Sequence, residues 1–345
     1  MSDPSTHPWL SGLFGDPEIC AVLSPEAELQ RFLKVEAAWT RALGKLSTTQ
    51  DAESVARSIE SMKIEPLALR EGLAKDGVPI PSLVKLLKAS IKNEALVHQG
   101  LTSQDVMDTS LMLALVEILA VFRARLAQLD QRLADLQSRY GGASIMAFTR
   151  MQAALETTVV VVIDRWREPL ARLQNDLKEA QSACAIIQWG GPIGTRDHPQ
   201  ADQLASVFAR NLGLKDPGSA WHTDRFVITQ LVHLFTGMAI ATGKIGEDIA
   251  LMAAIGADQI VLSGGESSAM SHKNNPVKAE ALISLSVHAA SLQMSLTNAA
   301  RHEGFRSGRA WMLEWLTLPQ LCVTVGAAVI RADHLLDSVT SIGRS

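Results

Sequence analysis

Long stretches without proline constrain the fold of this chain more than any other feature. Three of them, residues 82–168, 218–275 and 277–318, cover more than half of the 345-residue sequence. A proline inside a helix removes a backbone hydrogen bond and clashes with the preceding turn, so its absence permits helices far longer than the usual three turns. The chain therefore has room for several long helices.

The apolar residues within these stretches recur at helical spacing. Between residues 115 and 140 the spacing alternates between four and three, at Leu115, Leu119, Phe122, Leu126, Leu129, Leu133, Leu136 and Tyr140. This seam predicts a helix over Ser103–Tyr140 that ends at Gly141–Gly142. Strand-like alternation is nearly absent. Further long helices are predicted over residues 155–185, 226–260, 277–300 and 319–342.

The first 95 residues show a different pattern. Shorter helices are predicted there, over residues 26–46 and 51–62, with a turn at 77–81. We therefore predict an all-α fold with two domains. Residues 1–95 form a small N-terminal helical domain, and residues 96–345 form a central bundle of long helices.

Composition excludes several classes of function. The net charge of −4 supplies no basic surface for nucleic acid, and three widely spaced cysteines fit neither a disulfide framework nor a zinc site. The N-terminus does not have the pattern of a secretory signal, and no run approaches the roughly 18 apolar residues of a membrane span. These features predict a cytoplasmic protein without a nucleic-acid or membrane partner.

Three polar segments interrupt the helical pattern, and the first is residues 98–105, His-Gln-Gly-Leu-Thr-Ser-Gln-Asp. Either Thr102 or Ser103 can cap the long helix that follows. The free N–H groups and the dipole of that helix would favour an anion there. A simple helix cap without a ligand is the alternative interpretation.

The second interruption is residues 146–152, where Thr149, Arg150 and Gln152 place a hydroxyl, a guanidinium and an amide within four residues. The planar guanidinium suits a carboxylate. A solvated loop between helices is the alternative interpretation.

The third interruption is residues 263–276, Ser-Gly-Gly-Glu-Ser-Ser-Ala-Met-Ser-His-Lys-Asn-Asn-Pro. Pro276 suits the first position of the next helix, with Asn275 as its cap. Lys273 then places a cation just before the positive end of a helix, which is unfavourable unless an anion binds between them. A merely structural loop is the less favoured interpretation.

Helix length adds a constraint on how these segments meet. The predicted helix Ser103–Tyr140 has 38 residues, which at ~1.5 Å per residue span roughly 57 Å. The first interruption lies at its start and the second beyond its end, so one subunit cannot bring them together. We expect a symmetric homo-oligomer, most simply a tetramer, with active sites shared between subunits.

At these residues the sequence resembles the fumarase/aspartase superfamily. The third interruption is similar to the superfamily's Gly-Ser-Ser-x-Met-Pro-x-Lys-x-Asn-Pro signature, with departures at Glu266 and Ser271. The first matches His-x-Gly-x-Thr-Ser-x-Asp-x-x-Asp-Thr throughout. The second resembles Met-x-Arg-Thr-His-x-Gln, but Phe148 replaces the Arg and Arg150 replaces the His. Residues 190–195, Gly-Gly-Pro-Ile-Gly-Thr, resemble a further turn of the family.

Within the superfamily the chain is most similar to the carboxymuconate cycloisomerases. Residues 13–19 and residues 311–316, just after Glu303 and Arg306, carry this likeness. The resemblance implies a fumarase/aspartase-type bundle of long helices. Members of the superfamily usually continue into a small C-terminal helical domain, which we expect to be absent because the sequence stops at Ser345.

The resemblance also implies a chemistry, namely proton transfer at a carbon α to a carboxylate. Ser267 is then the residue that transfers the proton, and Lys273 and Asn275 stabilise the charged intermediate. The expected substrate-binding residues are His98, Thr102, Ser103, Thr149, Arg150, Gln152, Ser268 and Arg306.

Arginine at position 150 favours lactonisation, because the attacking carboxylate is already ionised and needs orientation rather than a base. The expected reaction is therefore closure of 3-carboxy-cis,cis-muconate to a lactone in protocatechuate breakdown. Three alternatives stay open: a 3-sulfomuconate cycloisomerase, a lyase of the adenylosuccinate or argininosuccinate type with His98 or His302 as general acid, and a catalytically silent homologue.

The remaining histidines, among them His222, show no metal-ligand spacing and are interpreted as structural or surface residues. No segment has the pattern of a phosphate-binding loop attached to a strand. We expect neither a metal nor an organic cofactor.

Overall fold

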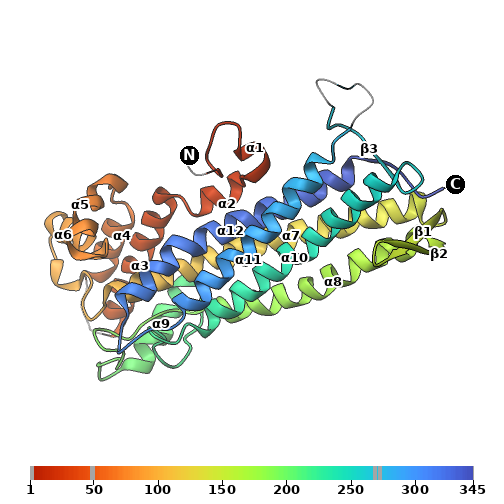
Figure 1. Cartoon of the computed structure of the whole chain (residues 1–345). Coiled ribbons are helices and arrows are strands. Elements are labelled where there is room, and N and C mark those ends of the chain that lie inside the picture. The colour runs from red at the N-terminus through yellow and green to blue at the C-terminus, as the bar shows by residue number, and fades with distance from the viewer. Residues whose placement is uncertain (1–3, 47–50, 267–269, 271–273, 345) are drawn as a thin grey trace.

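The computed structural model describes residues 4–46, 51–266, 270 and 274–344. The long helices that follow residue 102 lie side by side in one elongated bundle (Figure 1). They are α7 (Ser103–Tyr140), α8 (Val159–Cys184), α10 (Phe226–Ile255), α11 (Val277–Ala299) and α12 (Gly308–Asp337). This bundle confirms the predicted all-α class.

Helix α7 has the predicted bounds. The seven seam positions from Leu115 to Leu136 are fully buried and form part of the main hydrophobic core with residues of the other four long helices. Gly141 is the C-cap residue of the helix, and its N–H donates to the carbonyl oxygen of Gln137. The heptad-like spacing therefore marks the side of α7 on which the bundle closes.

A β-hairpin stands where the start of the second long helix was predicted. Strand β1 (Ser144–Thr149) pairs antiparallel with β2 (Gln152–Thr158), and α8 begins only at Val159. Arg150 and Met151 join the strands with φ values of 48° and 66°. Two consecutive left-handed residues make the turn that matches strand twist, so the prediction of helix from residue 155 was wrong.

The last helix also differs from its prediction. α12 begins at Gly308, runs through Pro319 and ends at Asp337, whereas the sequence predicted a start at Pro319. Burial of Leu318 and Leu321 on either side of the proline holds this turn in the core despite the lost hydrogen bond. Residues 339–342 are not helical but form strand β4, which pairs with β3 (Ile260–Leu262).

From Leu29 onward, the N-terminal part forms a second hydrophobic cluster beside one end of the bundle, whereas Ile19 and Val22 belong to the main core. Trp39 packs against Trp189 and Phe208, so α9 (Ala201–Leu212) belongs to this cluster although it lies late in the sequence. The boundary near residue 95 stays a prediction. The N-terminal elements are α1 (Ser11–Phe14), α2 (Pro17–Val22), α3 (Pro25–Leu46), α4 (Ala52–Glu60), η1 (Pro66–Leu69), α5 (Arg70–Asp76), α6 (Ile80–Ser90) and η2 (Glu94–Leu96).

Two bundle helices are more apolar than the sequence analysis expected. By length and composition, α10 and α12 each contain a window that could cross a membrane. Half of that window in α10 and two thirds of it in α12 are buried inside the protein. The buried side chains of these windows belong to the core of the bundle, whereas Phe226 and Ile240 of α10 and Leu316 of α12 are exposed.

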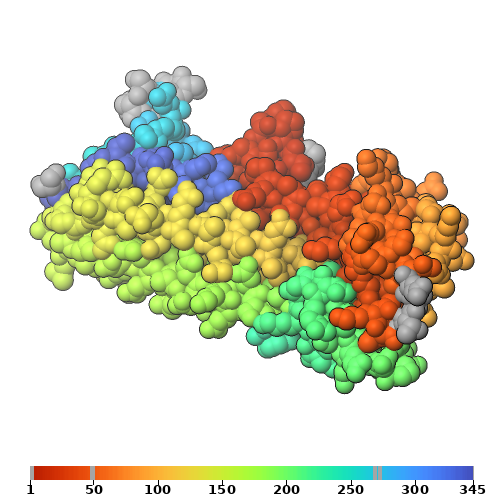
Figure 2. All heavy atoms as spheres, turned by 180° about the vertical axis from the view of Figure 1, so that it is seen from behind, coloured from red at the N-terminus to blue at the C-terminus, as the bar shows by residue number. Residues whose placement is uncertain are grey.

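The direction of α7 fixes where the three polar interruptions can lie. The helix starts beside α9 and the N-terminal helices and ends at the β1–β2 hairpin (Figure 1). Seen from behind, α7 and α8 form one long face, with α4, α5, α6 and the segment that contains α9 gathered at one end (Figure 2). We call the end at Thr102 the helix-start end and the end at the hairpin the hairpin end.

Candidate functional site

The predicted site residues divide between the two ends of the bundle. His98, Thr102, Ser103 and Arg306 lie at the helix-start end. Thr149, Arg150 and Gln152 form the tip of the hairpin at the other end, and Asn275 lies just before α11. Ser267, Ser268 and Lys273 fall outside the described residues. Along α7 the two ends are separated by 38 residues, or roughly 57 Å.

An arginine and a helix start meet at the first of these ends. Thr102 is the N-cap residue of α7, and Ser103 is the first helical residue. The Arg306 guanidinium donates to Thr102 Oγ1 at 2.7 Å and to the carbonyl oxygen of Pro192 at 3.0 Å. A fixed cation therefore stands beside the positive end of a long helix, an arrangement that favours an anion.

Beneath Thr102 lies a buried carboxylate that the prediction of site residues did not include. Asp105 is fully buried and accepts hydrogen bonds from the backbone N–H groups of Thr102, Gly190 and Gly191, at 2.9–3.0 Å. Its Oδ1 also lies 2.8 Å from Nε2 of His222. Burial raises the pKa of Asp105, and these hydrogen bonds oppose that shift.

A second buried network follows one turn later along α7. The Arg225 guanidinium donates to both oxygens of Asp108, at 2.7 and 3.0 Å, and to both oxygens of Glu314, at 3.1 and 2.6 Å. All three side chains are at most 2% exposed. Burial raises the pKa of Glu314, while the charge of Arg225 lowers it. Beside this cluster, burial and then the charge of Arg225 lower the pKa of His302.

His98 has a carboxylate partner that the sequence did not reveal. Its Nδ1 lies 2.6 Å from Oε1 of Glu36, which is fully buried on α3. The other oxygen of Glu36 has no hydrogen-bond partner within the part of the chain that the structure describes. The backbone of His98 is left-handed, with φ 59°. Because Nδ1 is engaged with Glu36, Nε2 is the ring nitrogen left for a substrate.

The hairpin end is built differently. Thr149, Arg150 and Gln152 are all exposed at the tip of a ribbon, and a surface ion pair between Glu156 and Arg344 at 2.6 Å ties its base to the end of the chain. Within a single chain these three residues are solvated, as the alternative interpretation expected, but they belong to a β-hairpin and not to a loop between helices.

The stem of the third interruption is closed by backbone contacts. The Asn275 N–H donates to the carbonyl oxygen of Gly265 at 2.8 Å, and Glu266 pairs with Asn274 as an isolated bridge. A side chain at Gly265 would meet the Asn275 carbonyl oxygen at 2.0 Å, so glycine is required there for close approach. The N-cap of α11 is Pro276 rather than the predicted Asn275, and the helix starts at Val277.

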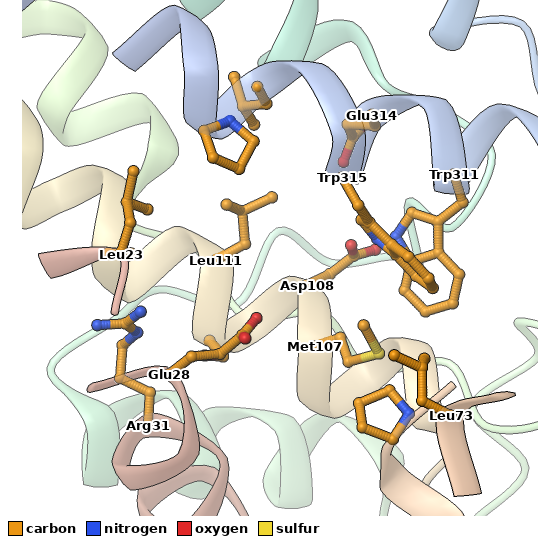
Figure 3. A pocket seen from close by; sticks show the side chains of 15 residues that line it. Leu23, Glu28, Arg31, Leu73, Met107, Asp108, Leu111, Trp311, Glu314 and Trp315 are labelled. Carbon is orange, nitrogen blue, oxygen red and sulfur yellow. The ribbon is translucent and has the colours of Figure 1, made fainter. Parts of the chain in front are cut away.

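A cavity of about 260 Å³ opens between the N-terminal helices and the bundle (Figure 3). Asp108 and Glu314 reach its wall beside Trp311 and Trp315. None of the predicted site residues that the structure describes lines this cavity. Among the described residues there is also no group of three or more His, Cys, Asp and Glu side chains that could hold a metal ion.

Comparison with known proteins places the geometry in a family. A family model described as "Lyase" matches residues 36–290. A Pseudomonas aeruginosa protein named 3-carboxy-cis,cis-muconate cycloisomerase is 32% identical over 98% of this chain and 77% of its own length. A nitrosuccinate lyase of Streptomyces davaonensis is 28% identical over 93% of this chain and 72% of its own. The crystal structure of a 3-carboxy-cis,cis-muconate lactonizing enzyme from Pseudomonas putida superposes with a TM-score of 0.90 at 28% identity, over 97% of this chain and 77% of that one.

Proposed function

The chain belongs to the lyase family of the fumarase/aspartase superfamily, and from that membership we propose that it is a cycloisomerase. Its reaction closes 3-carboxy-cis,cis-muconate to a carboxymuconolactone. The names of similar proteins support this substrate, since four curated relatives at 26–32% identity carry the name 3-carboxy-cis,cis-muconate cycloisomerase.

The contact between Arg306 and Thr102 is the observation that carries the proposal. It fixes a guanidinium at the start of α7, where the helix dipole adds to its positive charge. A muconate with three carboxylates offers one to this end and still has others for a second cation. Arg150, which stands where the family's lyases have histidine, is our candidate for that second cation.

In the reaction, a carboxylate oxygen forms a bond to a carbon of the diene, and the neighbouring carbon, which is α to another carboxylate, takes up a proton. The trianion and one proton give the dianionic lactone and no group leaves, so atoms and charge balance, and the group that donates the proton regains it from water. Arg150 orients the attacking carboxylate and transfers no proton, because guanidinium stays charged. Ser267 delivers the proton, and Lys273 and Asn275 stabilise the negative charge that develops on the carboxylate of the intermediate.

The remaining site residues bind the substrate. At the helix-start end these are His98, Thr102, Ser103 and Arg306; from the other segments they are Thr149, Gln152 and Ser268. The separation of the two ends along α7 supports a homotetramer in which neighbouring subunits bring them together. We place this enzyme in the cytoplasm, in keeping with its three widely spaced cysteines.

An amine-eliminating lyase is the second candidate, because a specific contact favours it. The pair His98–Glu36 offers a ring nitrogen held by a buried carboxylate, as a general acid requires. Such a lyase releases fumarate, whereas a cycloisomerase removes a diene and releases nothing.

One set of assays separates these reactions. Purified protein is incubated with 3-carboxy-cis,cis-muconate, 3-sulfomuconate and adenylosuccinate, and loss of diene absorbance and formation of fumarate are followed. We expect rapid loss of the carboxymuconate diene without fumarate. Turnover of adenylosuccinate alone would replace the proposal with the lyase, preference for the sulfonate would change the substrate, and no turnover would indicate a silent homologue.

A further inference from the structure

A single carboxylate joins three distant segments at the helix-start end. Asp105 accepts from the N–H of Thr102 on its own helix, from the N–H groups of Gly190 and Gly191, and from His222, which lies 117 residues away. Oδ1 receives Gly190 and His222, and Oδ2 receives Thr102 and Gly191. Each oxygen therefore has two donors, which is the full capacity of an ionised carboxylate.

The same segments hold Arg306. Its guanidinium donates to Thr102 Oγ1 and to the carbonyl oxygens of Gly191 and Pro192, at 2.7, 3.4 and 3.0 Å. Arg306 thus bonds both Thr102 and the glycine turn, which Asp105 also bonds. Arg306 and Asp105 have no hydrogen bond to each other. A shift of the glycine turn relative to Thr102 would separate the acceptors that fix the guanidinium.

His222 is locked in this arrangement. It is 4% exposed, and because Asp105 is an acceptor, Nε2 must carry the proton that the two share. Its Nδ1 is buried without a hydrogen-bond partner among the residues that the structure describes. A side chain at Gly190 would meet the His222 ring at 2.7 Å, so the glycine turn packs directly on the imidazole. Among the described residues, the hydrogen bond to Asp105 is therefore the side-chain contact that fixes the orientation of the ring.

We infer that Asp105 and His222 are positioning residues for the anion site, where they hold Thr102 and the Gly190–Gly191 turn in the spacing that Arg306 needs. This inference rests on the proposed function for the identity of the anion, a substrate carboxylate. The two residues act through Thr102, the turn and Arg306. Loss of the pair therefore weakens binding of carboxylates more than it weakens the fold.

Three variants test this on the assembled enzyme. His222→Gln keeps an N–H donor for Asp105, His222→Met fills a similar volume without one, and Thr109→Val is the matched control. Thr109 also lies buried on α7. Its hydroxyl bonds the backbone N–H and C=O of Gln188 and makes no hydrogen bond to Asp105 or His222. We expect His222→Met to raise KM for carboxymuconate about tenfold, or 1.4 kcal/mol, with kcat reduced less. His222→Gln and Thr109→Val should stay within about threefold of the wild-type KM.

Melting temperature and calorimetric binding of tricarballylate, a saturated tricarboxylate, complete the test. We expect His222→Met and Thr109→Val to melt at similar temperatures, while only His222→Met binds tricarballylate about tenfold more weakly. Equal KM and equal tricarballylate affinity in His222→Met and His222→Gln would overturn the inference. An enzyme that turns over no muconate but shows this order of tricarballylate affinities would refute only the substrate, and a wild type that binds neither compound would overturn both.

Discussion

The start of α7 and the hairpin beyond its last turn carry the same kinds of polar residue in opposite surroundings. At the start, Thr102 and Arg306 stand on two buried networks, centred on Asp105 and on Arg225, whose charges are met within the chain. At the hairpin, Arg150 lies exposed at a turn tip. The first end is organised before any ligand arrives, whereas the second is exposed and, in the proposed oligomer, would acquire its surroundings from a neighbouring subunit.

The largest expected difference between the two ends is in stability. Arg225→Met leaves Asp108 and Glu314 buried without their cation and should destabilise the protein by about 3–5 kcal/mol. The same change at exposed Arg150 should shift stability by less than about 0.5 kcal/mol. Urea unfolding of both variants, followed by circular dichroism, measures the contrast. Similar midpoints for the two would refute the distinction between the ends.

Substitution of Arg150 should affect activity strongly although it hardly affects stability, because Arg150 is proposed to orient a carboxylate. Arg150→Lys keeps the charge but loses the planar fork. The value of kcat/KM should therefore fall by a factor that corresponds to about 1–3 kcal/mol of lost binding free energy. Arg150→His should fall at least as far and gain a pH dependence between about 5 and 8, since only the charged imidazole replaces guanidinium. Steady-state kinetics across this range decides. Wild-type activity in Arg150→His would make residue 150 a proton donor and favour the lyase.

The smallest expected effect concerns pH at the helix-start end. Burial and the charge of Arg225 lower the pKa of His302 in the folded protein, while the unfolded chain keeps the ordinary value of about 6.5. Below that pH the unfolded chain takes up a proton that the folded protein resists, so stability is lost as pH falls. His302→Gln should lose less stability than wild type between pH 7.5 and 5.5. Parallel melting curves for both proteins would remove His302 as the cause.

The sequence predicted what depends on local spacing. The bounds of α7 followed from its seam and from the glycine pair after it, and the bounds of α3 and α11 lie within one residue of their predictions. The hairpin was missed because β1 is only partly buried and β2 is mostly exposed, and because its turn uses Arg150 and Met151 rather than the usual Asn-Gly. Pro319 was taken as a helix start because tertiary packing around it is invisible in sequence.

The candidate site was also predictable only in part. Thr102 and Arg306 were expected to bind substrate, and the structure brings them within 2.7 Å. Asp105 and Arg225 were missed as organising residues because their partners lie up to 117 residues away. The motif that contains Asp105 and the turn at residues 190–195 were both visible in the sequence. Only the fold shows that one carboxylate joins them.

In the proposed oligomer, each active site combines the helix-start end of one subunit with the third interruption of another. Ser267→Ala and Thr102→Ala should each lose most activity, with kcat of the serine variant reduced on the order of 10² or more. The two inactive proteins are unfolded together, refolded as mixed oligomers and assayed with carboxymuconate. If the two residues come from different subunits, random mixing restores both in about a quarter of the sites, so we predict about a quarter of wild-type activity. No recovery from mixed oligomers, or full activity in an isolated wild-type monomer, would show that active sites are not shared between subunits.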